Sequence, residues 1–250
     1  MALMKKTVFL LVLALILSGS FLTAGENGTL SKHAGRVFIT RHGQRDKGKA
    51  PDYDPPLTED GRKQAHLVAG ELAKRKFKGV IYASPYRRTL ETAAIIAAKT
   101  GSRLYLAPLA QEYARRPGKP RTLARPLSEL KKEFPLIATE HLPDDWLIRG
   151  PETFLSVKER VNKMLASMPP KPQNEDWLFV THGAVIKGFH LLCVDYRGGK
   201  EPEMPVHWNC CLSEYHFLPG GKLKMISLFD VSFIPEELIT SKSRRKIPAQ

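Results

Sequence analysis

Two short apolar runs in this chain each end on a histidine followed by glycine, and this repeated pattern constrains the fold most. Arg-His-Gly stands at positions 41–43 and Thr-His-Gly at positions 181–183. Short apolar runs of this kind are typical of buried strands in a parallel sheet, whose carboxyl ends share one edge. We therefore expect an α/β fold in which His42 and His182 meet in one crevice.

The first of these histidines is flanked by two arginines. Arg41 directly precedes His42, and Arg45 follows it by three positions. A guanidinium group carries a planar fork of donors that matches the oxygens of a phosphate dianion. Neutral imidazole can attack phosphorus and carry the phosphoryl group covalently, which divides one difficult displacement into two easier ones. His42 is therefore the candidate nucleophile, and Gly43 is expected to let backbone and ligand approach closely because it lacks a side chain.

Further motifs continue this pattern along the chain. A strand candidate over residues 80–83 runs into Ser-Pro-Tyr-Arg-Arg-Thr-Leu-Glu-Thr-Ala at 84–93, which brings arginine to another strand end. Pro-Leu-Thr-Glu-Asp-Gly-Arg-Lys-Gln-Ala stands at 56–65 and Gly-Pro-Glu-Thr at 150–153. Together with the two histidine tripeptides, these motifs resemble the histidine phosphatase superfamily, in the branch that includes the cofactor-dependent phosphoglycerate mutases. A lone Arg-His-Gly would be weak evidence, but five matches in family order are specific.

The resemblance implies a role for each matching residue. His42 would be the phosphorylated nucleophile, with Arg41, Arg45 and His182 around the phosphoryl group. The family arginine after Ser-Pro stands at the fifth position of that motif, which here is Arg88. The resemblance thus predicts a catalytic pair, His42 and His182, in a phosphate site built from three arginines.

The resemblance also implies a proton donor a few residues past a third strand, and Glu112 occupies that place. Its surroundings depart from the family pattern, since Leu109 stands three residues before it instead of two and residues 113–116 replace a glycine-rich segment. A structural role for Glu112, such as capping a helix, is the alternative. Arg87 is expected to be solvated. Five further histidines lack arginine neighbours at a strand end and are expected to be structural: His66, His141, His190, His207 and His216.

Apolar periodicity and turn residues place the remaining elements. They predict helices over 58–76, 87–100, 128–134, 153–167 and 183–192, a strand over 177–180, and an antiparallel hairpin over 212–218 and 223–229. Together with the resemblance, this order predicts a three-layer α/β/α sandwich with a mostly parallel central sheet. A hydrophobic content of 42% is enough for one sizeable core, in a single domain over residues 34–234.

The first 24 residues have the order of a secretory signal peptide. Lys5 and Lys6 precede a continuous apolar run at 8–17, and small residues follow it. We therefore expect export to a periplasmic or extracellular location. An uncleaved membrane anchor is the alternative, and no stable membrane span remains if the signal is cleaved.

Cysteine usage predicts little covalent or metal chemistry. Cys193, Cys210 and Cys211 are three in number, and adjacent cysteines rarely bridge each other, so at most one disulfide is expected. No spacing is typical of a metal site. The site is thus expected to need neither a metal nor a cofactor.

Positive charge is concentrated in two segments of a chain whose formal net charge is +14. An insertion over residues 114–150 is expected to cover the crevice as a lid, and residues 235–250 form a basic tail. Residues 114–132 include one acid, Glu129, and seven cations: Arg115, Arg116, Lys119, Arg121, Arg125, Lys131 and Lys132. Such a field raises the encounter rate of anions, which suits phosphorylated small molecules, multiply charged ones included.

Three functions remain open at this point. A secreted phosphomonoesterase working through a phosphohistidine leads. A phosphoglycerate mutase type of phosphotransfer fits the export signal less well. A non-catalytic polyanion binder of the same fold is the third, although the paired histidines argue against it, and no nucleic acid is expected as partner.

Overall fold

The computed structural model describes residues 30–46, 54–113, 127–139, 151–200, 202–204 and 206–241. Within them a seven-stranded mixed sheet runs in the order β4-β3-β2-β5-β1-β6-β7. Its strands are β1 (Gly35–Arg41), β2 (Gly79–Ala83), β3 (Arg103–Leu106), β4 (Ile137–Ala138), β5 (Asp176–Thr181), β6 (Leu212–Phe217) and β7 (Leu223–Asp230). The five strands from β4 to β1 are parallel, and β6 and β7 add an antiparallel hairpin. The predicted mostly parallel sheet is therefore confirmed.

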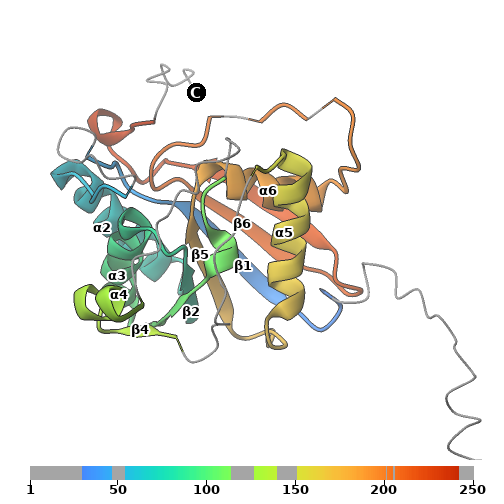
Figure 1. Ribbon diagram of the computed structural model, residues 1–250, viewed down its shortest axis with the longest axis horizontal. Helices are drawn as coiled ribbons and strands as arrows, with labels where there is room; N and C mark the ends of the chain where they lie inside the picture. Colours follow the sequence, from blue (N-terminus) through green and yellow to red (C-terminus); the bar gives the residue numbers. More distant parts are fainter. Residues whose placement is uncertain are drawn as a thin grey trace, which may run out of the picture.

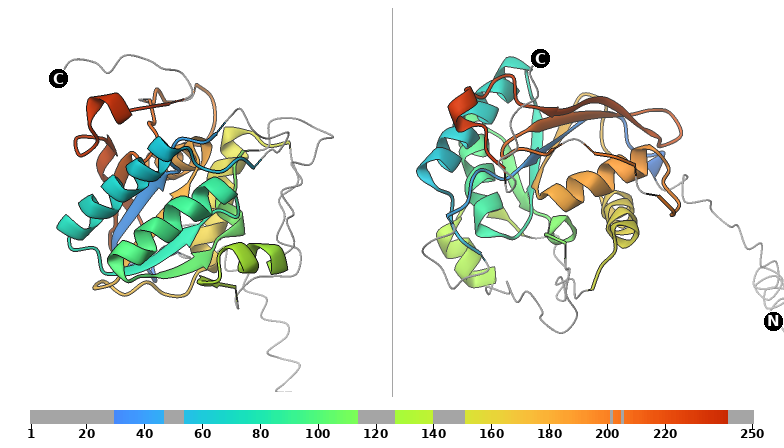
Figure 2. Two further views of the ribbon diagram at one scale, coloured as in Figure 1. Left: turned by 90° about the vertical axis from the view of Figure 1, so that its left-hand side faces the viewer. Right: turned by 90° about the horizontal axis from the view of Figure 1, so that it is seen from above.

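Within the described residues, five α-helices cover the sheet on both faces. They are α2 (Glu59–Lys74), α3 (Arg87–Thr100), α4 (Leu127–Glu133), α5 (Phe154–Ser167) and α6 (Gly183–Cys193). Two 3-10 turns complete the described elements, η2 (Pro108–Ala110) and η3 (Glu236–Leu238). Figure 1 and the view from above in Figure 2 show α2 and α3 on one face and α5 and α6 on the other. This is the expected three-layer sandwich.

The two layers arise because successive side chains of a strand point to opposite faces of the sheet. Phe38 on β1 and Leu178 on β5 belong to the buried cluster beneath α2 and α3. Their neighbours Ile39 and Phe179 belong to the second cluster, which packs against α5 and α6. All four side chains are fully buried. Continuous apolar runs were therefore needed in these two central strands, as parallel sheets covered on both faces require.

Local signals set the ends of the helices. Thr58 begins α2, where its hydroxyl accepts a hydrogen bond from the Gly61 amide at 3.0 Å. A capping box between Thr153 and Ser156 begins α5. Gly101 ends α3 in the left-handed conformation, with φ of 67°. These ends agree with the predicted helices to within two residues.

The predicted insertion differs from expectation in its middle part. There α4 and β4 extend the edge of the sheet, where β4 pairs with β3. Leu130 and Phe134 are buried in the cluster shared with α2 and α3. These residues therefore belong to the sandwich instead of covering a crevice, because their apolar side chains complete its edge. The rest of the insertion, residues 114–126 and 140–150, lies outside the described residues.

The beginning of the predicted tail also packs against the domain. The amide of Gln64 on α2 donates to the Leu238 carbonyl at 2.6 Å. The Asn209 backbone amide donates to the Thr240 carbonyl at 2.8 Å. Residues 242–250 and the predicted signal peptide, residues 1–24, lie outside the described residues. Among the described helices, none is both long and apolar enough to cross a membrane.

Candidate active site

The two histidines predicted to share a crevice lie side by side at the carboxyl ends of β1 and β5. These strands pair in parallel, with Arg41 opposite Thr181. Each histidine is the next residue along its strand, and the His42 amide donates to the Thr181 carbonyl at 3.0 Å. The ring centroids of His42 and His182 are 5.3 Å apart, and both side chains are buried. The sheet order thus joins two positions that are 140 residues apart in the chain.

Hydrogen bonding fixes the tautomer of His42. Its Nδ1 lies 2.7 Å from the Gly43 carbonyl oxygen, which can only accept, so Nδ1 carries the hydrogen. The Nε2 atom therefore holds a lone pair. Burial, assisted by the charges of Arg88 and Arg41, lowers the pKa of His42 well below 6.5. The ring is neutral near pH 7, as a nucleophile must be.

In His182 the hydrogen lies on the other ring nitrogen, Nε2. An Arg88 Nη2 donor lies 3.2 Å from Nδ1 of His182, and because a guanidinium only donates, Nδ1 accepts. The hydrogen is on Nε2, which lies 2.8 Å from the hydroxyl oxygen of the fully buried Ser84. Burial and the Arg88 charge lower the pKa of His182 well below 6.5. The role of Ser84 was not predicted, although it stands in the 84–93 motif.

Two buried arginines turn unsatisfied donors toward this edge of the sheet. Arg88 is 3% exposed, and its Nε and Nη1 have no hydrogen-bond partner among the described residues. Arg41 is likewise buried and leaves Nε unpaired there, while its Nη1 donates to the His207 carbonyl at 2.8 Å. Burial lowers the pKa of Arg88 to about 10, so it stays charged at neutral pH. Buried unpaired guanidinium donors suit an anion such as phosphate.

The third predicted arginine lies nearer the surface. Arg45 is half-buried, and its backbone forms an isolated antiparallel bridge with Leu57. Its charge helps to lower the pKa values of Arg41, His42 and Arg88, which indicates that its guanidinium is close to them. All three predicted arginines are thus brought to one place.

The candidate proton donor is also brought to the histidines. One carboxylate oxygen of Glu112, Oε2, lies 3.7 Å from Nδ1 of His182 and 3.9 Å from Nη2 of Arg88. The other oxygen accepts from the Tyr113 amide at 3.1 Å. Glu112 follows the turn η2 and caps no described helix. Its placement fits acid–base chemistry better than the structural alternative.

A neighbouring carboxylate was not singled out from the sequence. Both oxygens of Asp54 accept from the backbone amide of Arg87 at the start of α3, at 2.7 and 2.9 Å. Oδ1 of Asp54 also lies 3.6 Å from Nη1 of Arg88. Asp54 therefore partly balances the buried Arg88 charge. The Arg87 side chain points elsewhere: its Nε is 2.7 Å from Glu133 and 3.1 Å from Glu91, so Arg87 is ion-paired as well as partly exposed.

The backbone around His42 is held by three side chains whose contacts were not predicted, although Gln64 and Thr92 stand in the motifs at 56–65 and 84–93. The Asn209 side-chain amide donates to the His42 carbonyl at 2.9 Å. The Gly43 amide donates to the Thr92 hydroxyl at 3.1 Å, and the Gln44 amide to the Gln64 side chain at 2.8 Å. These three bonds fix the loop that carries the candidate nucleophile.

A glycine is needed at position 43 for a different reason from the one expected. A Cβ at Gly43 would overlap the carbonyl oxygen of Gly61, and a Cβ at Gly61 would overlap the carbonyl oxygen of Gln44. The two glycines therefore let the histidine loop and the start of α2 touch backbone to backbone. The structure assigns Gly43 to this packing, whereas the sequence suggested an approach to a ligand.

The other histidines occupy varied places. His66 is exposed, His190 is buried on α6, and Nε2 of His216 lies 2.8 Å from a carboxylate oxygen of Glu214. His207 packs so closely over Gly183 that a Cβ there would overlap its ring. It thus lies beside the site, which its sequence context did not indicate. His141 is outside the described residues.

The described residues include the three cysteines and most of the side chains that could bind a metal. No group of three or more His, Cys, Asp and Glu side chains among them is arranged to hold a metal ion. All three cysteines are free thiols, with Cys210 and Cys211 fully buried. Burial raises the pKa of Cys211 to about 12. The expectation of at most one disulfide agrees with these free thiols.

Comparisons with known proteins agree with this fold. Phosphoglycerate mutase-like protein 4 of Arabidopsis thaliana is 26% identical over 158 residues, which are 62% of this chain and 69% of that protein. A mycobacterial glucosyl-3-phosphoglycerate phosphatase superposes with a TM-score of 0.57 and 20% identity, covering 79% of this chain and 99% of the other. A phosphoserine phosphatase variant from Entamoeba histolytica, solved with phosphoserine, gives 0.57 and 22%, covering 80% and 100%. These two likenesses show the fold.

The match at the level of the whole family covers most of the chain. The sequence model of branch 1 of the histidine phosphatase superfamily matches residues 37–227. That range runs from β1 to β7 and contains every predicted site residue. The chain therefore belongs to branch 1 of the histidine phosphatase superfamily.

Proposed function

We propose that this protein is a phosphomonoesterase that works through a phosphohistidine at Nε2 of His42. The observation that carries the proposal is the tautomer of His42, whose Nδ1–H is held by the Gly43 carbonyl and whose Nε2 lone pair is free. Burial keeps this ring neutral. The unpaired donors of Arg41 and Arg88 supply the positive surroundings that a phosphoryl group needs.

The reaction follows in two steps. In the first, Nε2 of His42 forms a bond to phosphorus while the bond to the ester oxygen breaks, and Glu112 gives its proton to the departing alcohol. In the second, water attacks the phosphohistidine, the Glu112 carboxylate takes a proton from that water, and the N–P bond breaks to release phosphate and restore His42. Arg41 and Arg88 stabilise the charge on the phosphoryl oxygens in both steps, and His182 holds the Arg88 guanidinium in place.

The substrate class we propose is a small phosphorylated metabolite that carries a second anionic group. The structural relatives act on such compounds by name, phosphoserine and glucosyl-3-phosphoglycerate. The run from residue 114 to 126, which holds five cations and no acid, supports the second charge. We further propose that the protein is exported, on the strength of the basic and apolar order of residues 1–24.

The test is to trap the covalent intermediate. Brief incubation with a 32P-labelled substrate, followed by a quench, should leave acid-labile and alkali-stable label on the wild-type protein. The His42→Ala variant should carry no label and should lose about a thousandfold or more in turnover, because no other group replaces the nucleophile. Full turnover in that variant would overturn the proposal. Transfer of the label to a second substrate molecule, in place of water, would establish a mutase.

A further inference from the structure

One buried ion pair near the site belongs to neither step of the proposed reaction. Arg160, on α5, pairs with Glu152 in a bidentate manner, with Nε–Oε1 at 2.7 Å and Nη2–Oε2 at 3.1 Å. The two side chains are only 6% and 7% exposed. Glu152 lies in the Gly-Pro-Glu-Thr motif at 150–153. Burying two charged side chains costs desolvation free energy, so we looked for a role of this pair beyond stability.

The same guanidinium reaches the backbone just before the candidate proton donor. Nη1 of Arg160 donates to the Leu109 carbonyl at 2.5 Å and to the Gln111 carbonyl at 3.0 Å. Gln111 is buried and directly precedes Glu112. Two carbonyls of one short turn are thereby tied to α5 through a single side chain.

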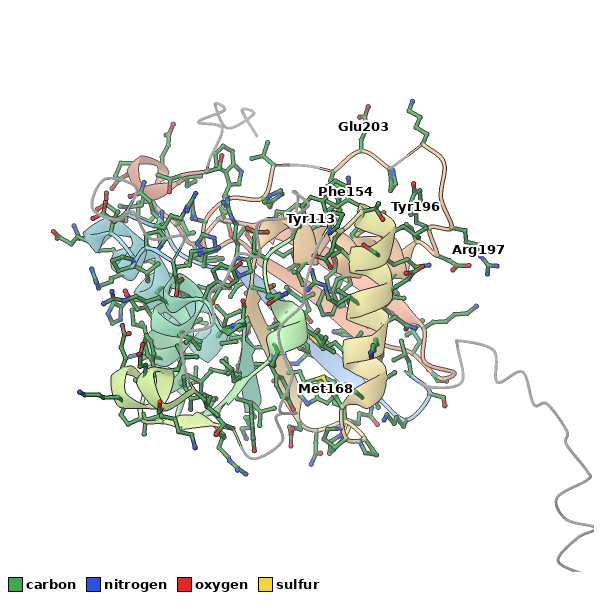
Figure 3. All side chains as sticks on the ribbon, in the orientation of Figure 1. Tyr113, Phe154, Met168, Tyr196, Arg197 and Glu203 are labelled. Atoms are coloured by element: carbon green, nitrogen blue, oxygen red, sulfur yellow. The ribbon has the colours of Figure 1, made fainter. Side chains whose placement is uncertain are left out.

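A second contact secures the turn on the other side of Glu112. The ring of Tyr113 stacks on that of Phe154, with centroids 5.1 Å apart and an angle of 8° between the planes. Figure 3 shows these two side chains next to each other at one end of α5. Phe154 is the first residue of α5 and lies two positions after Glu152. The backbone is therefore held to α5 both before and after Glu112.

We propose that Arg160, held in place by Glu152, is a positioning residue that fixes the Glu112 carboxylate beside His182. The inference rests on the proposed phosphatase reaction and goes beyond it. Glu112 lies two residues past η2, a three-residue 3-10 turn that has little rigidity of its own. Two of the guanidinium's five donors bind Glu152, and Nη1 bridges two backbone oxygens. Lysine cannot reproduce this geometry, because its ammonium is a single point of charge.

The experiment compares two substrates in Arg160→Lys and in the milder Glu152→Gln. An alkyl phosphate needs a proton on its leaving group, whereas 4-nitrophenyl phosphate does not. We expect Arg160→Lys to lower kcat on the alkyl phosphate by about 100-fold, within the range that general acid catalysis supplies, and to leave nitrophenyl phosphate nearly unchanged. Glu152→Gln should act in the same direction with a smaller loss.

Arg36 offers a matched control. It also pairs in a bidentate manner with a buried carboxylate, that of Asp176, and its guanidinium donates to the carbonyls of Arg75 and Lys76. It stands near the amino end of β1, at the opposite edge of the sheet from the histidines. Arg36→Lys should therefore lower the melting temperature without changing the ratio of the two substrates.

A double variant separates positioning from general damage. Once Glu112→Gln has removed the acid, adding Arg160→Lys should cost nothing further on the alkyl phosphate. Additive losses in that cycle would overturn the inference. Equal losses on both substrates in Arg160→Lys and Glu152→Gln, or no loss in either, would also overturn it. Failure of the reaction itself would show differently, as full turnover in His42→Ala.

Discussion

Each buried imidazole of the site is held by a partner whose hydrogen-bonding role cannot change. The Gly43 carbonyl only accepts, and the Arg88 guanidinium only donates. His42 therefore presents a lone pair at Nε2, while His182 presents a hydrogen there to Ser84. Two residues of the same type thus acquire different chemistry from single contacts.

Glu112 is the residue whose role is most open to a direct test. Its carboxylate faces His182 and Arg88, where an ester oxygen leaving the phosphoryl group would need a proton. We expect Glu112→Gln to lower kcat on alkyl phosphates by about 100-fold and to affect 4-nitrophenyl phosphate little. Steady-state kinetics on both substrates measures the difference.

Glu214 gives a matched control for this prediction. It is a mostly buried carboxylate on β6 that contacts Arg75 and His216. Glu214→Gln should leave the ratio of the two substrates as in wild type. If Glu112→Gln slowed both substrates equally, Glu112 would have a structural role.

At the scale of elements, the contact between α2 and the histidine loop is made by backbone. Gly61, at the start of α2, leaves no room for a Cβ against the Gln44 carbonyl oxygen. Gly70, near the end of the same helix, has nothing within 4 Å of the place a Cβ would take. One helix therefore contains a glycine that packing requires and another that it does not.

Substituting alanine at these two glycines should change the stability of the protein in opposite directions. Gly61→Ala should destabilise the protein by about 1–3 kcal/mol, because backbone atoms cannot move aside as a side chain can. It should also lower kcat, since Gln44 belongs to the loop of His42. Gly70→Ala should stabilise by about 0.5–1 kcal/mol through helix propensity and leave kcat alone. Urea unfolding and steady-state kinetics check both, and an unchanged stability in Gly61→Ala would contradict the packing argument.

At the scale of the whole molecule, the fold keeps two histidines uncharged at its centre. Their pKa values in the folded state lie below the ordinary value of 6.5 because burial disfavours the imidazolium. The unfolded chain therefore binds protons first as the pH falls. Above about pH 6.5 these two histidines should leave the free energy of unfolding unchanged. Below that pH the free energy of unfolding should decline by about 1.4 kcal/mol per pH unit for each histidine.

This pH dependence can be measured by urea unfolding between pH 7.5 and 5.5. The His182→Asn variant should show a smaller decline of stability than the wild type, because one titrating group is gone. Equal declines in the two proteins would show that other groups dominate the acid dependence.

Much of the fold and part of the site could be predicted from the sequence, because their causes are local. Apolar runs, caps and Gly101 depend on neighbours in the chain, and so do the arginines next to His42. The choice of Arg88 over Arg87 came instead from the family resemblance, through the motif at 84–93. The structure brings all these predicted groups to one edge of the sheet.

The contacts that hold the site in place depended on the tertiary structure alone. Asn209 reaches the His42 carbonyl across 167 positions, and Arg160 reaches that of Gln111 across 49. No periodicity or spacing encodes such pairs, because their energies arise only when the strand order brings distant segments within hydrogen-bond range. The sequence by itself therefore indicated which groups are candidates for the chemistry. The packing of α5, α2 and the 207–211 segment around β1 and β5 decided how those groups are oriented.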